Sequence, residues 1–292
     1  MSVAEAPRTG LPAALVSVDW AREHLDDPKV RFIEVDVDTT AYESGHLPGA
    51  VGFNWKTQLT DGIRRDLIAR EELERLLRDA GVDDDTTIVL YGDNNNWFAA
   101  WAYWQLRYHG IDNVKLLDGG RVKVEAAGLP LTTDAPSHPA GTITVPEGTR
   151  EELRAYRDEV ISGIGDASRG LVDVRSPEEF RGELAAPAHL PQEAAQRKGH
   201  IPGAVNVPWS TAVAEDGTFK PIDQLRELYA GKGIGGDKEI VAYCRIGERS
   251  SHTWFVLHEL LGYDKVRNYD GSWTEYGSLV GVPIETGDGS AN

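Results

Sequence analysis

The most reactive side chain in this sequence is that of its single cysteine. Cys244 stands in the stretch "AYCRIGERSSHTWF", residues 242–255, and is the only cysteine among 292 residues. An apolar run precedes it, and Arg245 and Arg249 follow it closely. Two readings are open: a loop that presents a nucleophile and holds an anion, or an inert buried thiol beside arginines that face solvent.

A free thiol is mostly protonated at pH 7, because its pKa is about 8.5. A helix N-terminus, its unpaired backbone N–H groups and nearby arginines would each lower that value. A loop centred on Gly247 can also turn its amides toward the sulfur. We therefore expect the Cys244 pKa to lie below the free value and Glu248 to face solvent. The residues expected to form the loop or to bind substrate are Arg245, Ile246, Gly247, Glu248, Arg249 and Ser250.

The length of the loop limits the chemistry it can perform. Cysteine-dependent phosphatases carry the pattern Cys-x5-Arg-Ser/Thr, whereas Cys244 and Arg249 have four residues between them. A shorter ring of amides suits one extra sulfur atom on the cysteine better than a tetrahedral phosphate. The spacing therefore disfavours a thiol phosphatase or an arsenate reductase.

The flanking sequence predicts how the loop is positioned. Short β-branched runs alternate with amphipathic stretches, which predicts βα units around a mostly parallel sheet. Strands are clearest at 171–174 and 239–243, and an apolar stripe at helical spacing follows at 251–262. Ser250 or Ser251 is the expected N-cap of that helix and Gly262 its C-terminal stop. Cys244 would then lie at the carboxyl end of a strand, where open α/β sheets place their ligands.

The chain also resembles itself. Residues 88–120 return as residues 240–272 at a constant offset, and "SGHLPGAVGFNW" returns as "KGHIPGAVNVPW". Such a long period indicates two copies of one domain. We predict an α/β protein with one domain over 1–140 and a second, cysteine-bearing domain over 141–292. The Thr-, Pro- and Gly-rich stretch 132–148 is the predicted linker.

The repeat separates structural residues from candidates for chemistry. His46 and His200 share one turn motif, and Asp118 and Asp270 also recur, so both pairs are expected to stabilise turns. Cys244 instead aligns with Gly92, and Arg245 and Arg249 align with Asp93 and Trp97. The predicted site therefore belongs to the second copy alone.

At these residues the chain resembles a tandem-domain rhodanese, a thiosulfate or mercaptopyruvate sulfurtransferase. The motifs that carry the resemblance are "GHIPGA" at 199–204, the strand end Asp173-Val174-Arg175, the loop from Cys244 to Arg249, and "YDGSW" at 269–273. The resemblance covers nearly the full length, with a degenerate first domain.

The resemblance implies a two-step exchange. The Cys244 thiolate attacks the outer sulfur of thiosulfate, sulfite departs, and a persulfide remains on Cys244 until cyanide or a thiol removes the sulfur. No metal or organic cofactor is implied. The acceptor could be a small thiol or a thioredoxin-like protein, and a persulfide carrier that serves a partner protein stays open as an alternative.

Further roles follow from the family pattern. Arg245 is similar to the residue of thiosulfate-using members, whereas mercaptopyruvate enzymes tend to carry glycine there. The position of a vertebrate-type substrate arginine is Glu179 here, and Arg181 is a candidate replacement. Asp173 and Arg175 are expected to brace the loop. Trp55 is expected either to form an apolar wall at the site or to pack in the core, and Trp97, Trp101 and Trp104 to fill the core or the domain interface.

The composition limits the partners. A formal net charge of −17 argues against nucleic acid and anionic membranes, because both attract clustered cations. The sequence shows no charged and apolar leader of the signal-peptide type and no apolar run near the ~18 residues of a membrane span. We expect a cytoplasmic protein with a reduced thiol.

Overall fold

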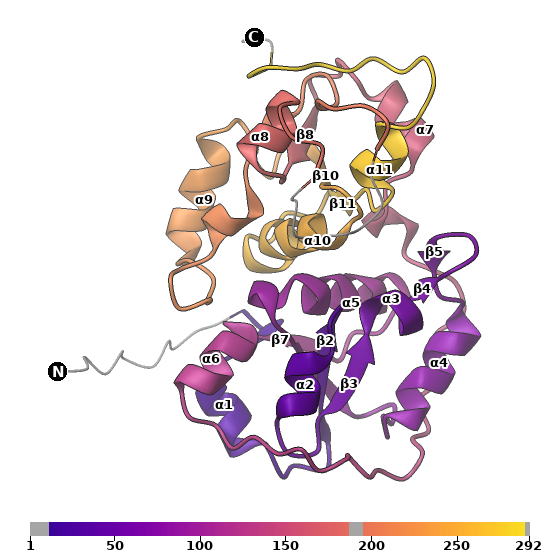
Figure 1. The fold of residues 1–292 in the computed structure, drawn as a ribbon, viewed down its shortest axis with the longest axis vertical. Coiled ribbons are helices and arrows are strands. Elements are labelled where there is room, and N and C mark those ends of the chain that lie inside the picture. Colours follow the sequence, from indigo (N-terminus) through magenta and orange to yellow (C-terminus); the bar gives the residue numbers. More distant parts are fainter. Residues whose placement is uncertain (1–11, 187–194, 290–292) are drawn as a thin grey trace, which may run out of the picture.

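The computed structural model describes residues 12–186 and 195–289. It contains two α/β domains stacked one on the other (Figure 1). The first has a five-stranded sheet in the order β1-β7-β6-β2-β3, and the second a four-stranded sheet in the order β11-β10-β8-β9. Every strand pair in these two sheets is parallel. The predicted fold class is therefore confirmed.

The elements of the first domain alternate as predicted. Its strands are β1 (Leu15–Val16), β2 (Val30–Asp36), β3 (Val51–Asn54), the hairpin pair β4 (Thr60–Asp61) and β5 (Asp66–Leu67), β6 (Thr87–Tyr91) and β7 (Val114–Leu117). Its helices are α1 (Val18–Glu23), α2 (Thr40–Ser44), α3 (Trp55–Gln58), α4 (Arg70–Asp79), η1 (Asn94–Asn96), α5 (Trp97–Tyr108) and α6 (Gly120–Ala126).

The second domain follows the same order. Its strands are β8 (Arg169–Asp173), β9 (Val205–Asn206), β10 (Glu239–Tyr243) and β11 (Val266–Asn268). Its helices are η2 (Glu151–Leu153), α7 (Arg157–Ser162), α8 (Pro177–Arg181), η3 (Trp209–Ala212), α9 (Ile222–Ala230), α10 (Glu248–Phe255), the π-helical turn η4 (Val256–Leu260) and α11 (Ser272–Tyr276).

Helices α5 and α10 face each other where the two domains meet (Figure 1). All eight residues of α10 are buried, as are eleven of the twelve in α5. Trp97, Trp101 and Trp104 belong to one apolar core that runs through both domains, as expected from their helical spacing. Each helix is buried on both sides because it covers its own sheet and also the other domain.

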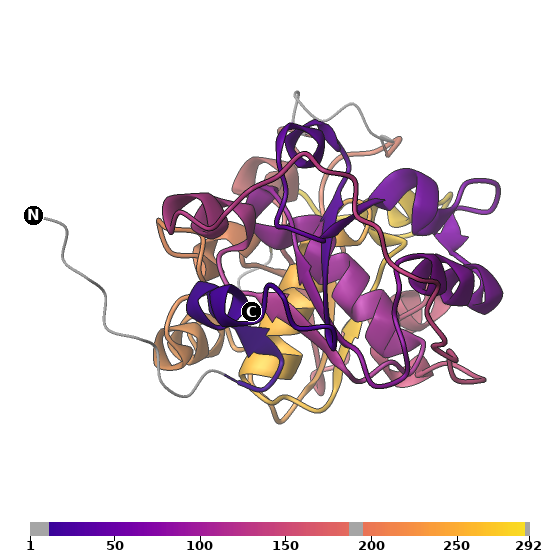
Figure 2. The same ribbon diagram turned by 90° about the horizontal axis from the view of Figure 1, so that it is seen from below.

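The segment predicted as a linker is fixed to the first domain. His46 and Thr132 exchange backbone hydrogen bonds, and the Thr142 N–H donates to the Asp83 carboxylate at 2.9 Å. Figure 2 shows this segment crossing the face of the first domain that lies away from the second. The predicted boundary at residue 140 thus falls inside a stretch that packs on the first domain, and as a division between folding units it stays a prediction.

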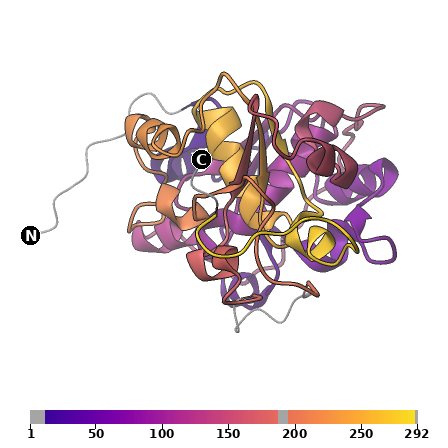
Figure 3. The ribbon, with the colours of Figure 1, turned by 90° about the horizontal axis from the view of Figure 1, so that it is seen from above.

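The C-terminal segment crosses the outer side of the second domain (Figure 3). His200 exchanges backbone hydrogen bonds with Glu285, and the Gly287 N–H donates to the Arg181 carbonyl at 3.0 Å. Within residues 12–186 and 195–289, no helix is long and apolar enough to cross a membrane. Most of the N-terminal stretch that we expect to lack a signal peptide lies outside these ranges.

The two recurring aspartates connect the domains. Asp118 accepts a hydrogen bond from the Phe219 N–H of the second domain at 2.9 Å. Asp270 binds Arg154 through both carboxylate oxygens, and Arg154 also reaches Asp66 of the first-domain hairpin at 2.7 Å. The turn role expected for this pair therefore extends to the domain interface. Burial alone would lower the Arg154 pKa, but the two carboxylates outweigh it and raise the pKa.

We expect Arg154→Ala to lower the free energy of unfolding by about 2–4 kcal/mol, because it leaves Asp66 and the largely buried Asp270 without their cation. Arg157→Ala is the matched control, since Arg157 forms an exposed pair with Asp158 and should leave the midpoint near wild type. Urea unfolding followed by tryptophan fluorescence measures both. Equal midpoints for the two variants would contradict the role of the Arg154 cluster.

Candidate active site

Cys244 directly follows β10, at the carboxyl edge of the second sheet. Helix α10 begins at Glu248, and its N-cap is Gly247 with φ of 101°. The predicted N-cap at Ser250 or Ser251 was therefore wrong: Gly247 adopts the left-handed conformation and turns the chain into a helix earlier. Both serine hydroxyls instead donate to the Gly247 carbonyl, at 3.0 and 2.8 Å. The C-terminal stop is confirmed, since Gly262 lies just beyond η4 with φ of 69°.

The Cys244 sulfur is enclosed by the loop. The Gly247 N–H donates to Sγ at 3.1 Å, and the Ser250 hydroxyl lies 3.6 Å from it. The Ser272 hydroxyl lies 4.0 Å from Sγ and accepts a hydrogen bond from the Cys244 N–H at 3.1 Å. Among these groups the Gly247 N–H is the donor to the sulfur, because the hydroxyl hydrogens of Ser250 and Ser272 are engaged with Asn268 and the Tyr269 carbonyl.

The loop is held from behind by the start of α11. The N–H groups of Trp273 and Thr274 donate to the carbonyls of Cys244 and Arg245, at 3.1 and 3.0 Å. The Asn268 side chain links the loop to β11, because it donates to the Gly247 carbonyl and accepts from the Ser250 hydroxyl at 2.7 Å. The peptide planes of the loop are therefore fixed before any ligand arrives.

Two electrostatic expectations for the loop were wrong. Glu248 is fully buried rather than exposed, and its Oε2 lies 3.4 Å from the Cys244 sulfur. The Cys244 pKa is raised rather than lowered, first because burial disfavours the thiolate and then because Glu248 adds a negative charge. Arg249 and the Ser250 hydrogen bonds lower it by less. Burial and Glu248 therefore both favour the neutral thiol over the thiolate.

Arg249 is committed to a buried ion pair. Its two terminal nitrogens donate to the two Glu179 oxygens at 2.9 and 3.1 Å, and both side chains are buried. Burial would raise the Glu179 pKa, but Arg249 outweighs it and the pKa is lowered. Glu179 comes from α8, within a capping box formed with Ser176. The pair therefore fixes the start of α10 to α8, and the Glu179 carboxylate neutralises the Arg249 charge.

Arg245 is the other buried cation of the loop. Its side chain is 1% exposed, and burial lowers its pKa, although the nearby Glu248 carboxylate opposes that shift. The loop region therefore gathers Arg245, Arg249, Glu179 and Glu248, two cations and two carboxylates, around one neutral thiol.

Arg175 connects the strand end to its neighbours, and its expected role in bracing the loop stays a prediction. Arg175 binds the Asp173 carboxylate, donates to the Gly199 carbonyl at 2.7 Å, and stacks on Trp273 at 4.7 Å. All these contacts are structural, and the described structure places neither Asp173 nor Arg175 on the sulfur.

In the first domain a different arginine links the strand end to the histidine turn. Arg121 donates to Glu34, which occupies the strand position of Asp173, and to the carbonyl of Gly45 in the equivalent turn. The motif histidines serve these turns as predicted, since His46 Nδ1 contacts the Tyr42 carbonyl and His200 Nδ1 the Phe180 carbonyl.

The first-domain loop has no room for a thiol. A Cβ atom at Gly92 would lie 2.4 Å from the Val35 carbonyl and 2.8 Å from the Asp36 carboxylate. Asn96 aligns with Glu248 of the second copy. Its side chain accepts a hydrogen bond from the Gly92 N–H at 3.0 Å and so binds the backbone of its own loop. The predicted asymmetry between the copies therefore has a steric basis.

The remaining candidates lie away from the sulfur. Trp55 packs in the core against Phe98 and Trp101, and its role as an apolar wall of the site stays a prediction. Arg181 pairs with Glu183 and Glu178 at the surface, and a substrate contact by this side chain stays a prediction.

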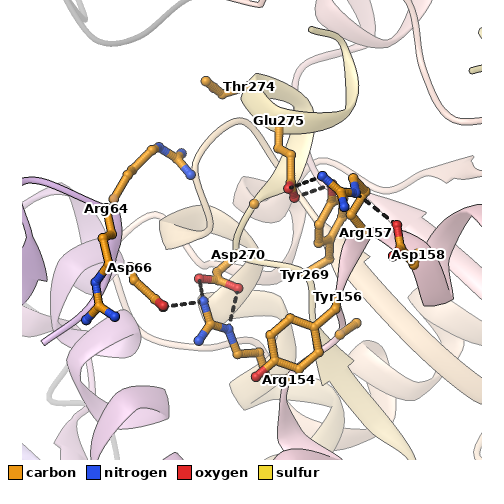
Figure 4. A pocket seen from close by; sticks show the side chains of 13 residues that line it. Arg64, Asp66, Arg154, Tyr156, Arg157, Asp158, Tyr269, Asp270, Thr274 and Glu275 are labelled. Carbon is orange, nitrogen blue, oxygen red and sulfur yellow. Dashed lines mark hydrogen bonds and ion pairs between the residues drawn. The ribbon is translucent and has the colours of Figure 1, made fainter. Parts of the chain in front are cut away.

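A cavity of about 610 Å³ opens between the domains next to the loop. Figure 4 shows Arg154, Asp66 and Asp270 on one side of it and Arg157, Asp158 and Glu275 on another. Cys244 is not among its lining residues, but Asp270 and Thr274 are, and both contact the loop. The Arg154 cluster that connects the two domains therefore forms part of the wall of this cavity.

Sequence reasoning missed three groups at the site: Glu179 as the partner of Arg249, and Asn268 and Ser272 as loop supports. For Glu179 the only signal was its place where vertebrate-type relatives carry arginine. Asn268 directly precedes the "YDGSW" motif and Ser272 lies within it. The proximity of this motif to Cys244 arises from the β10–β11 pairing.

Comparison with known proteins gives one family. The description "Rhodanese-like domain" matches residues 17–127 and again 156–279. A Mycolicibacterium smegmatis protein named "Putative thiosulfate sulfurtransferase" is 58% identical over 94% of this chain and 98% of its own. The "Sulfur carrier protein TtuD" of Thermus thermophilus is 55% identical over 95% of this chain and 98% of its own.

A solved structure shares the arrangement of both domains. The anaerobic ergothioneine biosynthesis enzyme from Chlorobium limicola superposes with a TM-score of 0.82 at 25% identity, over 94% of this chain and 70% of that one. Another, of the protein EanB, has a TM-score of 0.81 at 26% identity with the same coverage, and its description records a cysteine persulfide.

We expect Glu179→Gln to lower the free energy of unfolding by about 3–5 kcal/mol at pH 7, because it leaves the Arg249 guanidinium buried without a counter-charge. Glu178→Gln removes the same charge from an exposed neighbour and is the control. The Glu179 pKa is depressed in the folded state. The contribution is therefore complete above the free value of about 4.3 and is lost as the pH falls through the lower folded pKa.

Urea unfolding at pH 7 and at a series of acidic pH values measures the difference between the two variants. A difference that persists unchanged at the lowest pH would contradict an ion-pair origin.

Proposed function

The chain belongs to the family of proteins with rhodanese-like domains, and we propose that it moves sulfane sulfur from thiosulfate through a persulfide on Cys244. Sulfurtransferase activity itself follows from the family and from the names of its relatives. The choice of thiosulfate and the role of Cys244 are the proposal. The observation that carries it is the buried sulfur at the strand end, with the Gly247 N–H donating to it and the Ser250 and Ser272 hydroxyls beside it.

The proposed reaction has two steps. Sγ attacks the outer sulfur of thiosulfate, an Sγ–S bond forms, and the S–S bond of thiosulfate breaks with its electron pair going to sulfite. The terminal sulfur carries one negative charge, for which the loop donors are suited. Cyanide or a thiol acceptor then takes that sulfur and regenerates Cys244.

The donor preference is argued from charge. Thiosulfate is a dianion, and a protein with a net charge of −17 must gather cations where such a substrate binds. Arg249 is largely neutralised by Glu179, so Arg245 is the loop cation we assign to the departing oxyanion. Mercaptopyruvate, with a single carboxylate, would depend on it less.

A carrier role is the second candidate, favoured by the relative that is named a sulfur carrier protein. In that case the persulfide would pass to a partner protein, for example a thioredoxin-like one, and turnover with small acceptors would be slow. Steady-state rates with thiosulfate and a series of acceptors, cyanide, small thiols and reduced thioredoxin, separate the two candidates.

We expect Cys244→Ser to abolish thiocyanate formation from thiosulfate and cyanide while leaving the fold intact, because a serine hydroxyl stays protonated at neutral pH. Wild-type protein exposed to thiosulfate should gain the mass of one sulfur atom, about 32 Da, and the serine variant none. Intact-mass spectrometry and a thiocyanate assay measure both. A wild-type mass that never changes would exclude the covalent intermediate.

We expect Arg245→Gly to lower kcat/KM for thiosulfate by at least about tenfold, because one charge-assisted contact is worth about 1.5–3 kcal/mol. Activity with mercaptopyruvate should be spared or improved. Arg157→Ala, which removes one exposed cation, is the control for net charge. Equal losses for both donors in Arg245→Gly would mean that Arg245 shapes the loop rather than binding the dianion.

A further inference from the structure

The carboxylate of Glu248 contacts the reacting sulfur atom. Its Oε2 lies 3.4 Å from Cys244 Sγ, and both side chains are fully buried. A carboxylate oxygen only accepts hydrogen bonds, so the thiol S–H is the donor. The proton that must leave before sulfur can attack therefore already points to a base.

Glu248 keeps capacity to take that proton. Its other oxygen, Oε1, has no hydrogen-bond partner within the described residues. Arg249 Nε lies 3.8 Å from Oε1, but the terminal nitrogens of that guanidinium are held by Glu179. A buried carboxylate with an unpaired oxygen is costly, so the S–H donor at Oε2 is a favourable partner.

No other group described in the loop can accept the proton. Gly247 N–H is a donor to the sulfur, and the Ser250 and Ser272 hydroxyls are already engaged with Asn268 and the Tyr269 carbonyl. His252 lies one helical turn beyond Glu248, and burial lowers its pKa to about 3, but its ring contacts Trp209 and Phe219 instead. Among the residues that the structure describes, Arg245 and Arg249 interact electrostatically with Glu248. Arg249 is paired with Glu179, and Asp270, which lies behind Gly247, is paired with Arg154.

We propose that Glu248 is a catalytic residue, the general base that takes the Cys244 proton as thiosulfate is attacked. The proposal rests on the function proposed above and names the group that makes a buried thiol reactive. Proton transfer within the pair forms the thiolate without changing the net charge of the loop. It also moves the negative charge from the carboxylate to the sulfur, the atom that attacks and to which the Gly247 N–H donates.

The step balances in protons and electrons. The S–H proton moves to Glu248 Oε2, the sulfur electron pair forms the Sγ–S bond, and sulfite leaves with the pair of the broken S–S bond. When cyanide removes the outer sulfur, thiocyanate departs and the Cys244 thiolate returns. Glu248 then gives the proton back, so the cycle needs no external acid or base.

The test is the single-turnover rate of persulfide formation, followed by quenched-flow mass spectrometry in thiosulfate across a pH series. Thiolate content is measured separately by its ultraviolet absorbance, with Cys244→Ser as the blank. In the wild type, we expect the rate to stay high at pH values where almost no thiolate is present at equilibrium. A rate that rises in proportion to the thiolate content would overturn the proposal without any variant.

The variant Glu248→Gln separates two roles of the carboxylate, because a general base and a purely electrostatic role predict rate changes in opposite directions. Removing a negative charge lowers the thiol pKa and the repulsion of thiosulfate, so a carboxylate that acts by charge alone predicts a faster reaction at pH 7. A general base predicts a rate at least about tenfold slower at pH 7, rising with pH until it meets the wild type where the thiol ionises. A variant as fast as wild type at pH 7 would overturn the proposal.

Two controls separate this result from other failures. Glu178→Gln removes one exposed carboxylate and should keep the wild-type pH profile. Recovery of the Glu248→Gln rate at high pH shows that the loop of this variant is intact. If the variant does not fold, the comparison of rate with thiolate content in the wild type is by itself the test of the proposal. If the wild type forms no persulfide at any pH, the proposed function fails; if it forms one in step with the thiolate, only the role of Glu248 fails.

Discussion

Helices α5 and α10 pack against each other between the two sheets, and this contact encloses the region of Cys244. Because α10 is covered by its own sheet on one side and by α5 on the other, every residue of α10 is buried, polar ones included. Buried charges must then be paired or protonated. The Arg249–Glu179 pair and the thiol–carboxylate contact of Cys244 and Glu248 both follow from that enclosure.

Burial, more than the nearby arginines, determines the direction of the Cys244 pKa shift. A cation lowers the pKa of a thiol only to the extent that its charge is not already balanced. Here Arg249 is balanced by Glu179, and the Glu248 carboxylate lies 3.4 Å from the sulfur. In the mechanism proposed above, the reaction depends on proton transfer between this thiol and this carboxylate.

The duplication also explains why only one domain holds the site. Both copies brace the strand end to the histidine turn with an arginine, through Arg121 in the first and Arg175 in the second. They differ at the loop, where the first copy closes on Asn96 and leaves no room for a side chain at Gly92. The first domain instead contributes α5 and the hairpin aspartate Asp66, so its role is to enclose and fix the second.

The sequence by itself determined the two-copy α/β architecture, the strand before Cys244, the apolar stripe after it and the family. Each of these depends on local periodicity or on a contiguous motif, which a single chain displays directly. Only the tertiary structure decided which charges meet. Glu179 lies 70 positions from Arg249 in the chain, and no local pattern reveals that α8 brings them together. Glu248 looked like a surface residue because glutamate is seldom buried, and Gly247 at the N-cap turned it inward onto the sulfur. The direction of the Cys244 pKa shift followed from that placement, since burial and the sign of the nearest charge are properties of the packed molecule.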